Sequence, residues 1–227
     1  MTDNLNDIMN TPPEKRKTGM PKWLIIWIVV ASVALLGIGN YAYRFFSSKP
    51  VMDALNAGKL PYATTTDWTK ATYGVYGLSV ETPKKVLPGS LNLPDDVKKY
   101  IDRMDIFQSD SANGLNIQIV SAKYAAIVGQ GNLQGAANGA AAKMQAIDGV
   151  SDFISSDEHV ITKDSIPGII QSGKYKYGGA TDFEFIDAMY LKGLLYWQVV
   201  VVYMSKDDAS RQIAKRVVNS IEIEIPQ

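Results

Sequence analysis

The chain of 227 residues contains no cysteine and only one histidine. The absence of cysteine excludes disulfides, thiolate catalysis, thiolate metal sites and a lipid attached through an N-terminal cysteine. The chain also has no Asn-x-Ser/Thr glycosylation acceptor, which favours a bacterial protein over one from a glycosylated cell surface. A peptide segment is then the means left to hold the chain at a membrane.

A concentrated basic patch is lacking as well. Lys and Arg together number 23, as do Asp and Glu, and residues 50–227 carry 17 basic and 20 acidic side chains, a net charge of 17 − 20 = −3. A nucleic-acid-binding domain usually gathers its basic residues to neutralise phosphates. Here they are scattered among carboxylates, so we exclude a nucleic-acid partner.

One long apolar run is present near the N-terminus. No charged residue occurs from Leu24 to Gly39, and the extended run from Trp23 to Phe46 covers 24 residues. At 1.5 Å per residue a helix of this length measures about 36 Å, enough to cross a bilayer with some tilt. Aromatic residues flank the run at both ends, as is typical of membrane interfaces: Trp23 and Trp27, then Tyr41, Tyr43, Phe45 and Phe46. The pattern predicts a transmembrane helix over residues 23–46.

The charges around this run predict its orientation. Four basic residues precede it, namely Lys15, Arg16, Lys17 and Lys22, whereas two lie at or just beyond its end, Arg44 and Lys49. The positive-inside rule therefore places the N-terminus in the cytoplasm and the C-terminal part beyond the inner membrane. The alternative is a cleaved signal peptide, for which Gly37-Ile38-Gly39 offers a small-x-small cleavage site.

The chain divides into four parts on this interpretation. Residues 1–22 form a polar, disordered cytoplasmic tail, residues 23–46 the span and residues 47–69 a linker rich in Pro and Thr. Residues 70–227 form one extracytoplasmic domain of ordinary size. The expected fold class of this domain is α+β, with helices packed on an antiparallel β-sheet.

Strand patterns dominate the first half of the domain. The stretch "TYGVYGLSVETP" predicts strand structure ending at Pro83, and a short helix is expected from Asp95. The stretches "YIDRMDIFQSD" and "GLNIQIVSAKY" flank a turn at residues 111–114 and predict a hairpin. In the second stretch Leu115, Ile117 and Ile119 alternate with Asn116 and Gln118, which predicts one buried face and one wet face.

Two helices and an antiparallel meander are expected in the second half. Apolar residues recur at helical spacing from Leu133 to Ile147, with Asn132 as the N-cap and Gly149 at the end. Four strand patterns follow: "FISSDEHVITKD", "GIIQSGKYKYG", "TDFEFIDAMYL" and "LLYWQVVVVYM". Their short connections require antiparallel pairing, and the last is apolar enough for the sheet centre. Ser205 is the expected N-cap of a closing helix, before the final strand "SIEIEI".

The order of these patterns carries a resemblance. From "YGLSVETP" through the hairpin, the alanine-rich helix and "YWQVVVVY" to "DDASRQIAKRVVNSIEI", residues 68–225 resemble the PsbP-like domains. The resemblance implies an α/β/α sandwich and a binding or assembly accessory without catalysis. No functional residue is carried over, because no site motif of the family is matched, and a membrane anchor departs from the family's pattern.

The spacing of the glycines argues against a nucleotide-binding site. In "IVGQGNLQGAANGAAAKM" Gln134 stands where a dinucleotide-binding turn needs its third small residue, and Gly135 comes one position late. The helix is instead expected to pack closely through its alanines.

Few side chains are candidates for chemistry. Asp182 and Glu184 share a strand face and could act as paired carboxylates, or could hold a cation with Asp187 or Asp164. His159 is the one histidine on which a triad would depend, although an exposed strand histidine is the simpler interpretation. Tyr175 and Tyr177 share a face and could form a ligand platform or pack beneath a helix.

The hypothesis from the sequence is a single-pass, membrane-anchored binding or assembly accessory without catalytic activity, cofactor or metal, whose partner is another envelope protein or a small ligand. The alternative is an envelope hydrolase or metal-dependent enzyme that uses Asp182, Glu184 and His159. A third interpretation, a lipocalin-like barrel, is disfavoured by the two helices.

Overall fold

The computed structural model describes residues 68–83, 86–90, 93, 95–109, 115–162 and 165–225. Within these ranges, none of the helices is both long and apolar enough to cross a bilayer. The predicted tail, the predicted span at residues 23–46 and the linker up to residue 67 lie outside the described residues. They stay predictions.

The core of the fold is a seven-stranded sheet with the strand order β3-β4-β5-β9-β8-β7-β6. Its strands are β3 (Leu87–Pro88), β4 (Ile101–Gln108), β5 (Leu115–Tyr124), β6 (Val150–Ile161), β7 (Pro167–Tyr177), β8 (Thr181–Lys192) and β9 (Leu195–Met204). Every pairing in it is antiparallel. The predicted meander is thereby confirmed, and β9 takes the central position expected for the most apolar strand.

A second, small sheet is formed by β1 (Thr69–Tyr73), β2 (Leu78–Thr82) and β10 (Glu222–Ile223) in the order β1-β2-β10. The stretch up to Pro83 is therefore a hairpin, whose turn uses two glycines with positive φ, Gly74 and Gly77. The small sheet is joined to the large one by the Nε1 atom of Trp197, which donates a hydrogen bond of 3.0 Å to the carbonyl oxygen of Tyr76.

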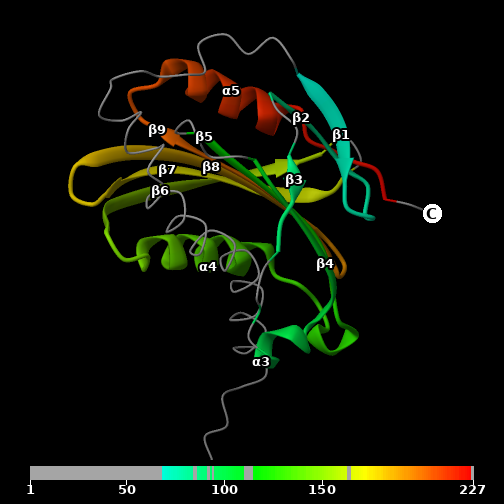
Figure 1. The fold of residues 1–227 in the computed structure, drawn as a ribbon. Helices are drawn as coiled ribbons and strands as arrows, with labels where there is room; N and C mark the ends of the chain where they lie inside the picture. The colour runs from blue at the N-terminus through cyan, green and yellow to red at the C-terminus, as the bar shows by residue number, and fades with distance from the viewer. Residues whose placement is uncertain are drawn as a thin grey trace, which may run out of the picture.

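Two helices cover opposite faces of the large sheet, α5 (Asp208–Asn219) on one face and α4 (Leu133–Gln145) on the other (Figure 1). The short helix α3 (Asp95–Lys98) and a 3-10 turn, η1 (Ala126–Val128), complete the described elements. On the α5 side, Ile213 and Val217 pack with Ile117, Ile119 and Trp197 of the large sheet. The α+β class with helices on an antiparallel sheet is confirmed.

Helix α4 lies close to the sheet because its inner face is small. Ala136, Ala137 and Ala140 are buried against β7 and β8, together with Met144. Asn132 is the N-cap as predicted, since its side-chain oxygen accepts a hydrogen bond of 3.1 Å from the backbone N–H of Gly135. The helix ends at Gln145, before Gly149, which lies in the turn to β6.

Two expectations need correction. The predicted wet face of β5 is wrong, because Asn116 and Gln118 are buried where β5 lies between β4 and β9. The N-cap of α5 is Asp207 rather than Ser205. The strand before the glycine-rich stretch is antiparallel to both neighbours and leads into η1, so the glycines of this stretch are not in the parallel setting that a dinucleotide-binding turn requires.

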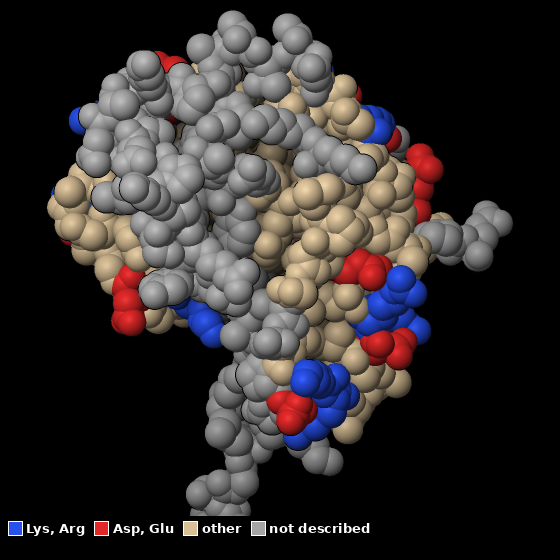
Figure 2. All heavy atoms as spheres, in the orientation of Figure 1, with Lys and Arg blue, Asp and Glu red and all other residues tan. Residues whose placement is uncertain are grey.

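Ion pairs neutralise much of the described surface. Lys123 contacts Asp102 at 2.9 Å, and Arg103 contacts Asp105 at 3.2 Å. On the face shown in Figure 2, basic and acidic side chains lie next to one another in the part not drawn in grey.

Candidate functional site

A groove lies between α5 and the edge strand β6, on the part of the sheet that α5 leaves uncovered. Helix α5 contacts β9, β8 and β2. Of the described helices, none therefore covers the α5 side of β7 and β6. Two adjoining hollows of about 700 and 470 Å³ occur here and share the lining residues Ile154, Lys174 and Glu184. We call them together the α5–β6 groove.

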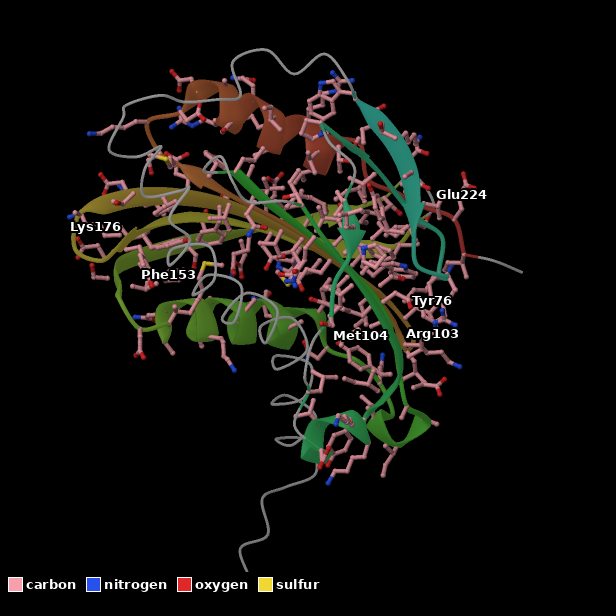
Figure 3. The ribbon with its side chains drawn as sticks, viewed as in Figure 1. Tyr76, Arg103, Met104, Phe153, Lys176 and Glu224 are labelled. Atoms are coloured by element: carbon pink, nitrogen blue, oxygen red, sulfur yellow. The ribbon has the colours of Figure 1, made fainter. Side chains whose placement is uncertain are left out.

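Register explains which side chains line the groove. Residues directly opposite in an antiparallel pair point to the same face of a sheet. Ile154 is opposite Lys174, and Lys174 is opposite Glu184. Phe153 and Lys176, which line the same hollow, lie at the end of the sheet far from Tyr76 and Arg103 (Figure 3). The groove therefore occupies one end of the molecule.

The wall of the groove formed by α5 is fixed by an ion pair. Arg211 donates hydrogen bonds from Nε and Nη2 to the two carboxylate oxygens of Glu184, at 3.0 and 2.9 Å, and Tyr203 donates a third at 2.9 Å. Partial burial acts to raise the pKa of Glu184, but the hydrogen bonds from Arg211 and Tyr203 outweigh it and hold this pKa below its usual value. Glu184 is thus a charged structural partner of α5.

The lining of the groove is more basic than acidic. Five basic side chains line it (Lys174, Lys176, Lys206, Arg211 and Lys215) against three acidic ones (Asp152, Asp182 and Glu184). Lys176 is paired with Asp152 at 2.7 Å, which holds the pKa of this carboxyl below its ordinary value through a hydrogen bond and charge attraction. Among the described residues, Lys174, Lys206 and Lys215 make no ion pair. The groove therefore carries net positive charge on an acidic domain.

An exposed apolar side chain lies in the middle of this charged lining. Ile154 is 58% exposed, although it belongs to a strand of the large sheet. It directly follows a register irregularity between β6 and β7, and the backbone of Asp152 within that irregularity has a φ of 50°. Bulges of this kind redirect side chains at sheet edges. Exposed apolar surface bordered by charges is a common feature of interaction sites.

The candidate residues from the sequence are only partly brought together. Asp182 and Glu184 do line one hollow. His159 is exposed and lies opposite Ile169, which is opposite Met189 in the core beneath α4, so His159 is on the other face of the sheet. Asp164 lies outside the described residues. Within the described ranges no group of three His, Cys, Asp or Glu side chains is arranged to hold a metal ion.

The aromatic candidates belong to the core. Tyr175 is buried and stacks on Phe183, with ring centroids 5.6 Å apart and an interplanar angle of 19°. Tyr177 packs on the edge of the same cluster beneath α4. Packing beneath a helix, one of the two interpretations from the sequence, is thus confirmed for Tyr175.

A row of mostly polar side chains lies on the face of the large sheet that α4 covers. The sequence alone did not reveal it. It crosses the sheet at one level, as the pairing of the strands shows, through Asp157, Gln171, Asp187, Val200 and Gln118. All members except Asp157 are buried, so the row belongs to the interior. Its residues are far apart in the chain, and only the strand register aligns them.

Hydrogen bonds link the outer part of this row to α4. The amide nitrogen of Gln171 donates to Oδ1 of Asp157 at 2.8 Å and to the carbonyl oxygen of Ala137 at 3.4 Å. Gln134 of α4 donates to Oδ2 of Asp157 at 2.9 Å. The helix is therefore held on the sheet by polar contacts as well as by its alanines.

The inner part of the row contains an ionisable group, Asp187, for which the described residues supply no counter-charge. Gln198 donates hydrogen bonds to both carboxylate oxygens of Asp187, and both residues are fully buried. Burial raises the pKa of Asp187 to about 7, the hydrogen bonds from Gln198 lower it in part, and the nearby carboxylate of Asp157 raises it. Asp187 is thus a titrating group of the core, on the face opposite Asp182 and Glu184.

Comparison with known proteins gives little beyond a likeness of fold. No protein-family model matches the chain, and no curated protein matches it. Among solved structures, the chain is similar to the solution structure of cyanobacterial PsbP (CyanoP) from Synechocystis sp. PCC 6803. This likeness has a TM-score of 0.49 and 8% sequence identity, over 74% of this chain and 99% of that chain.

A crystal structure of a protein from Bacteroides thetaiotaomicron is similar with a TM-score of 0.35 and 10% identity, over 69% of this chain and 49% of that chain. This chain spans about half the length of that protein. At these identities and TM-scores neither family membership nor function follows.

Proposed function

We propose that this protein is a single-pass membrane protein whose extracytoplasmic, PsbP-like domain binds a partner protein in the α5–β6 groove and performs no catalysis. The observation that carries the proposal is the groove itself. It combines an exposed Ile154 with uncommitted lysines at one end of the molecule. The anchor rests on the apolar run at residues 23–46 and on the basic residues before it.

The chemistry of the lining fits binding better than catalysis. Glu184 is engaged by Arg211 and Tyr203, so its carboxylate is not poised to exchange a proton near neutral pH. The enzyme alternative needs Asp182, Glu184 and His159 in one site, and His159 lies on the other face of the sheet. A binding surface needs no such convergence.

Photo-cross-linking of the full-length chain in its native membrane tests the proposal. A photoreactive residue at Ile154 is compared with one at Val75, which is also exposed and lies in the β1–β2 turn, next to Tyr76 at the far end of the molecule (Figure 3). We expect one discrete adduct from position 154, lost in a Lys174→Glu/Lys215→Glu variant, and none from position 75. Equal adducts from both positions, or none from position 154, would refute binding in the groove.

A further inference from the structure

The kind of partner can be specified further, in an inference that rests on the proposed function. We infer that the α5–β6 groove takes an extended polypeptide segment that adds to β6 as a further antiparallel or parallel strand. The segment presents acidic side chains toward α5. Three features of the described residues carry this inference: a free sheet edge, its continuity with the groove, and the charge of the groove.

The two edges of the large sheet differ in their capacity to accept a strand. One edge is β3, which has two residues and contains Pro88, whose nitrogen has no hydrogen to donate. The other is β6, which has 12 residues, contains no proline and pairs with β7 alone among the described strands. Eight of its 12 side chains are exposed. Of the two terminal strands of this sheet in the described part of the chain, β6 offers the longer edge.

The regular part of β6 is long enough for strand addition. Beyond the irregularity at residues 151–154, every residue from Ile154 to Ile161 has a partner in β7, from Lys174 to Pro167. This continuous ladder exceeds the usual strand length of about 5–6 residues. Strand addition supplies affinity through main-chain hydrogen bonds and specificity through the side chains of alternate residues.

The same strand forms one side of the groove. Ile154, Ser155 and Ser156 of β6 line it opposite Arg211 and Lys215 of α5. A strand added outside β6 lies about 10 Å from β7, two strand spacings away. Its side chains on the α5 face then contact Ile154 and come within reach of Lys174, which is opposite Ile154 on β7. Edge and groove thus act as one surface.

The positive charge of the groove favours a segment with negatively charged side chains. Lys174, Lys206 and Lys215 have no ion-pair partner among the described residues. Of the three lining carboxylates, Asp152 and Glu184 are paired and Asp182 has no ion pair in the same part of the chain, so positive charge is in excess. Acidic side chains on the α5 face would pair with these lysines. The segment needs uncharged residues beside Asp157 and Glu158, the acidic pair in the middle of β6.

A second copy of the chain fits this edge poorly. If two β6 strands paired antiparallel over the whole run from Ile154 to Ile161, Asp157 of one copy would face Glu158 of the other, twice across the two-fold axis. Like charges directly opposite one another destabilise a strand pair. The chemistry of the edge therefore favours a different polypeptide.

Two labelled peptides test the inference on the full-length protein in detergent. The first alternates valine and glutamate over about nine residues, and the second has lysine in place of each glutamate. Affinity is measured by fluorescence anisotropy, and strand pairing by hydrogen exchange of the β6 amides. We expect the glutamate peptide to bind at least about tenfold more tightly than the lysine peptide and to slow exchange at residues 155–160.

Charge variants provide the control. The double variant Lys174→Glu/Lys215→Glu is expected to weaken binding of the glutamate peptide by at least about tenfold. Lys192 is an exposed lysine at the end of β8, and Lys192→Glu is expected to change the affinity by less than about twofold. Equal affinity for both peptides, or unchanged exchange along β6, overturns the inference. If cross-linking at Ile154 still gives its adduct in that case, the proposed function stands and only the strand addition fails.

Discussion

The side-chain nitrogen of Gln198 lies 2.9 Å from Oδ1 and 2.8 Å from Oδ2 of Asp187, and both side chains are fully buried. This amide satisfies the carboxyl group but does not neutralise it. Asp187 interacts electrostatically with Asp157 of β6 and with Tyr196 of β9, and neither group brings a positive charge. The ionised form of Asp187 is consequently disfavoured in the folded protein.

The first prediction concerns the pH dependence of stability. Because burial raises the pKa of Asp187 from 3.8 to about 7, its contribution is fully present below about pH 4 and is lost as the pH rises to about 7. Asp187→Asn removes this dependence. We expect the free energy of unfolding of the variant, relative to the natural chain, to rise by about 2–4 kcal/mol between pH 4 and pH 8.

Urea unfolding of the full-length chain in detergent at both pH values measures this difference. Carboxyl groups far from position 187 have the same surroundings in both proteins, so their effects cancel in the comparison. Parallel pH profiles for the two proteins between pH 4 and pH 8 would show that folding does not raise the pKa of Asp187.

The second prediction concerns the wall of the groove. Glu184→Gln keeps the shape of the side chain but removes the charge that Arg211 binds with two hydrogen bonds. We expect a shift of the urea midpoint to lower concentration at pH 7, several times larger than the shift caused by Asp95→Asn, which breaks the exposed pair of Asp95 with Lys98.

At acidic pH the same comparison should show a smaller difference between the two proteins. The pKa of Glu184 is lowered in the folded protein, so its stabilising effect is present at neutral pH and is lost as the pH falls through that lowered pKa. The midpoints of the natural chain and the Glu184→Gln variant should therefore approach each other toward pH 3. A constant difference from pH 7 to pH 3 would contradict the assignment.

The third prediction separates two candidate N-caps of α5. The side chain of Asp207 accepts a hydrogen bond of 3.1 Å from the backbone N–H of Ser210, whereas the hydroxyl of Ser205 has no hydrogen-bond partner within the described part of the chain. Asp207→Ala is expected to lower the free energy of unfolding by about 1–2 kcal/mol. Ser205→Ala should change it by less than about 0.5 kcal/mol. Equal effects in urea unfolding would refute this distinction.

Local patterns predicted much of the fold. Asn132 precedes the helical repeat of α4 directly, and its cap contact involves Gly135, three residues away. The meander from β6 to β9 follows from short connections, which leave antiparallel pairing as the available solution. Helix caps and short connections depend on residues that are close together in the sequence, so they could be predicted from it.

Features that depend on distant neighbours were missed. The alternation of polar and apolar residues in β5 predicted that Asn116 and Gln118 face solvent. They are buried instead, because β5 has a strand on either side. Likewise, Asp157, Gln171 and Asp187 come together through strand register. His159 and Glu184 were grouped by strand composition, and the same register separates them to opposite faces.

We expect residues 23–46 to remain in the membrane and to place the domain outside the cytoplasm. Because the chain has no cysteine, one introduced thiol reports its location unambiguously. We would label Ala180→Cys, in the exposed β7–β8 turn, and Asn6→Cys, in the N-terminal tail, with a membrane-impermeant maleimide in cells with a permeabilised outer envelope but an intact inner membrane. We expect labelling of the full-length chain at position 180 and none at position 6 until the inner membrane is opened. Labelling at position 6 with protection at position 180, or a chain shortened to begin near Asn40, would contradict the account.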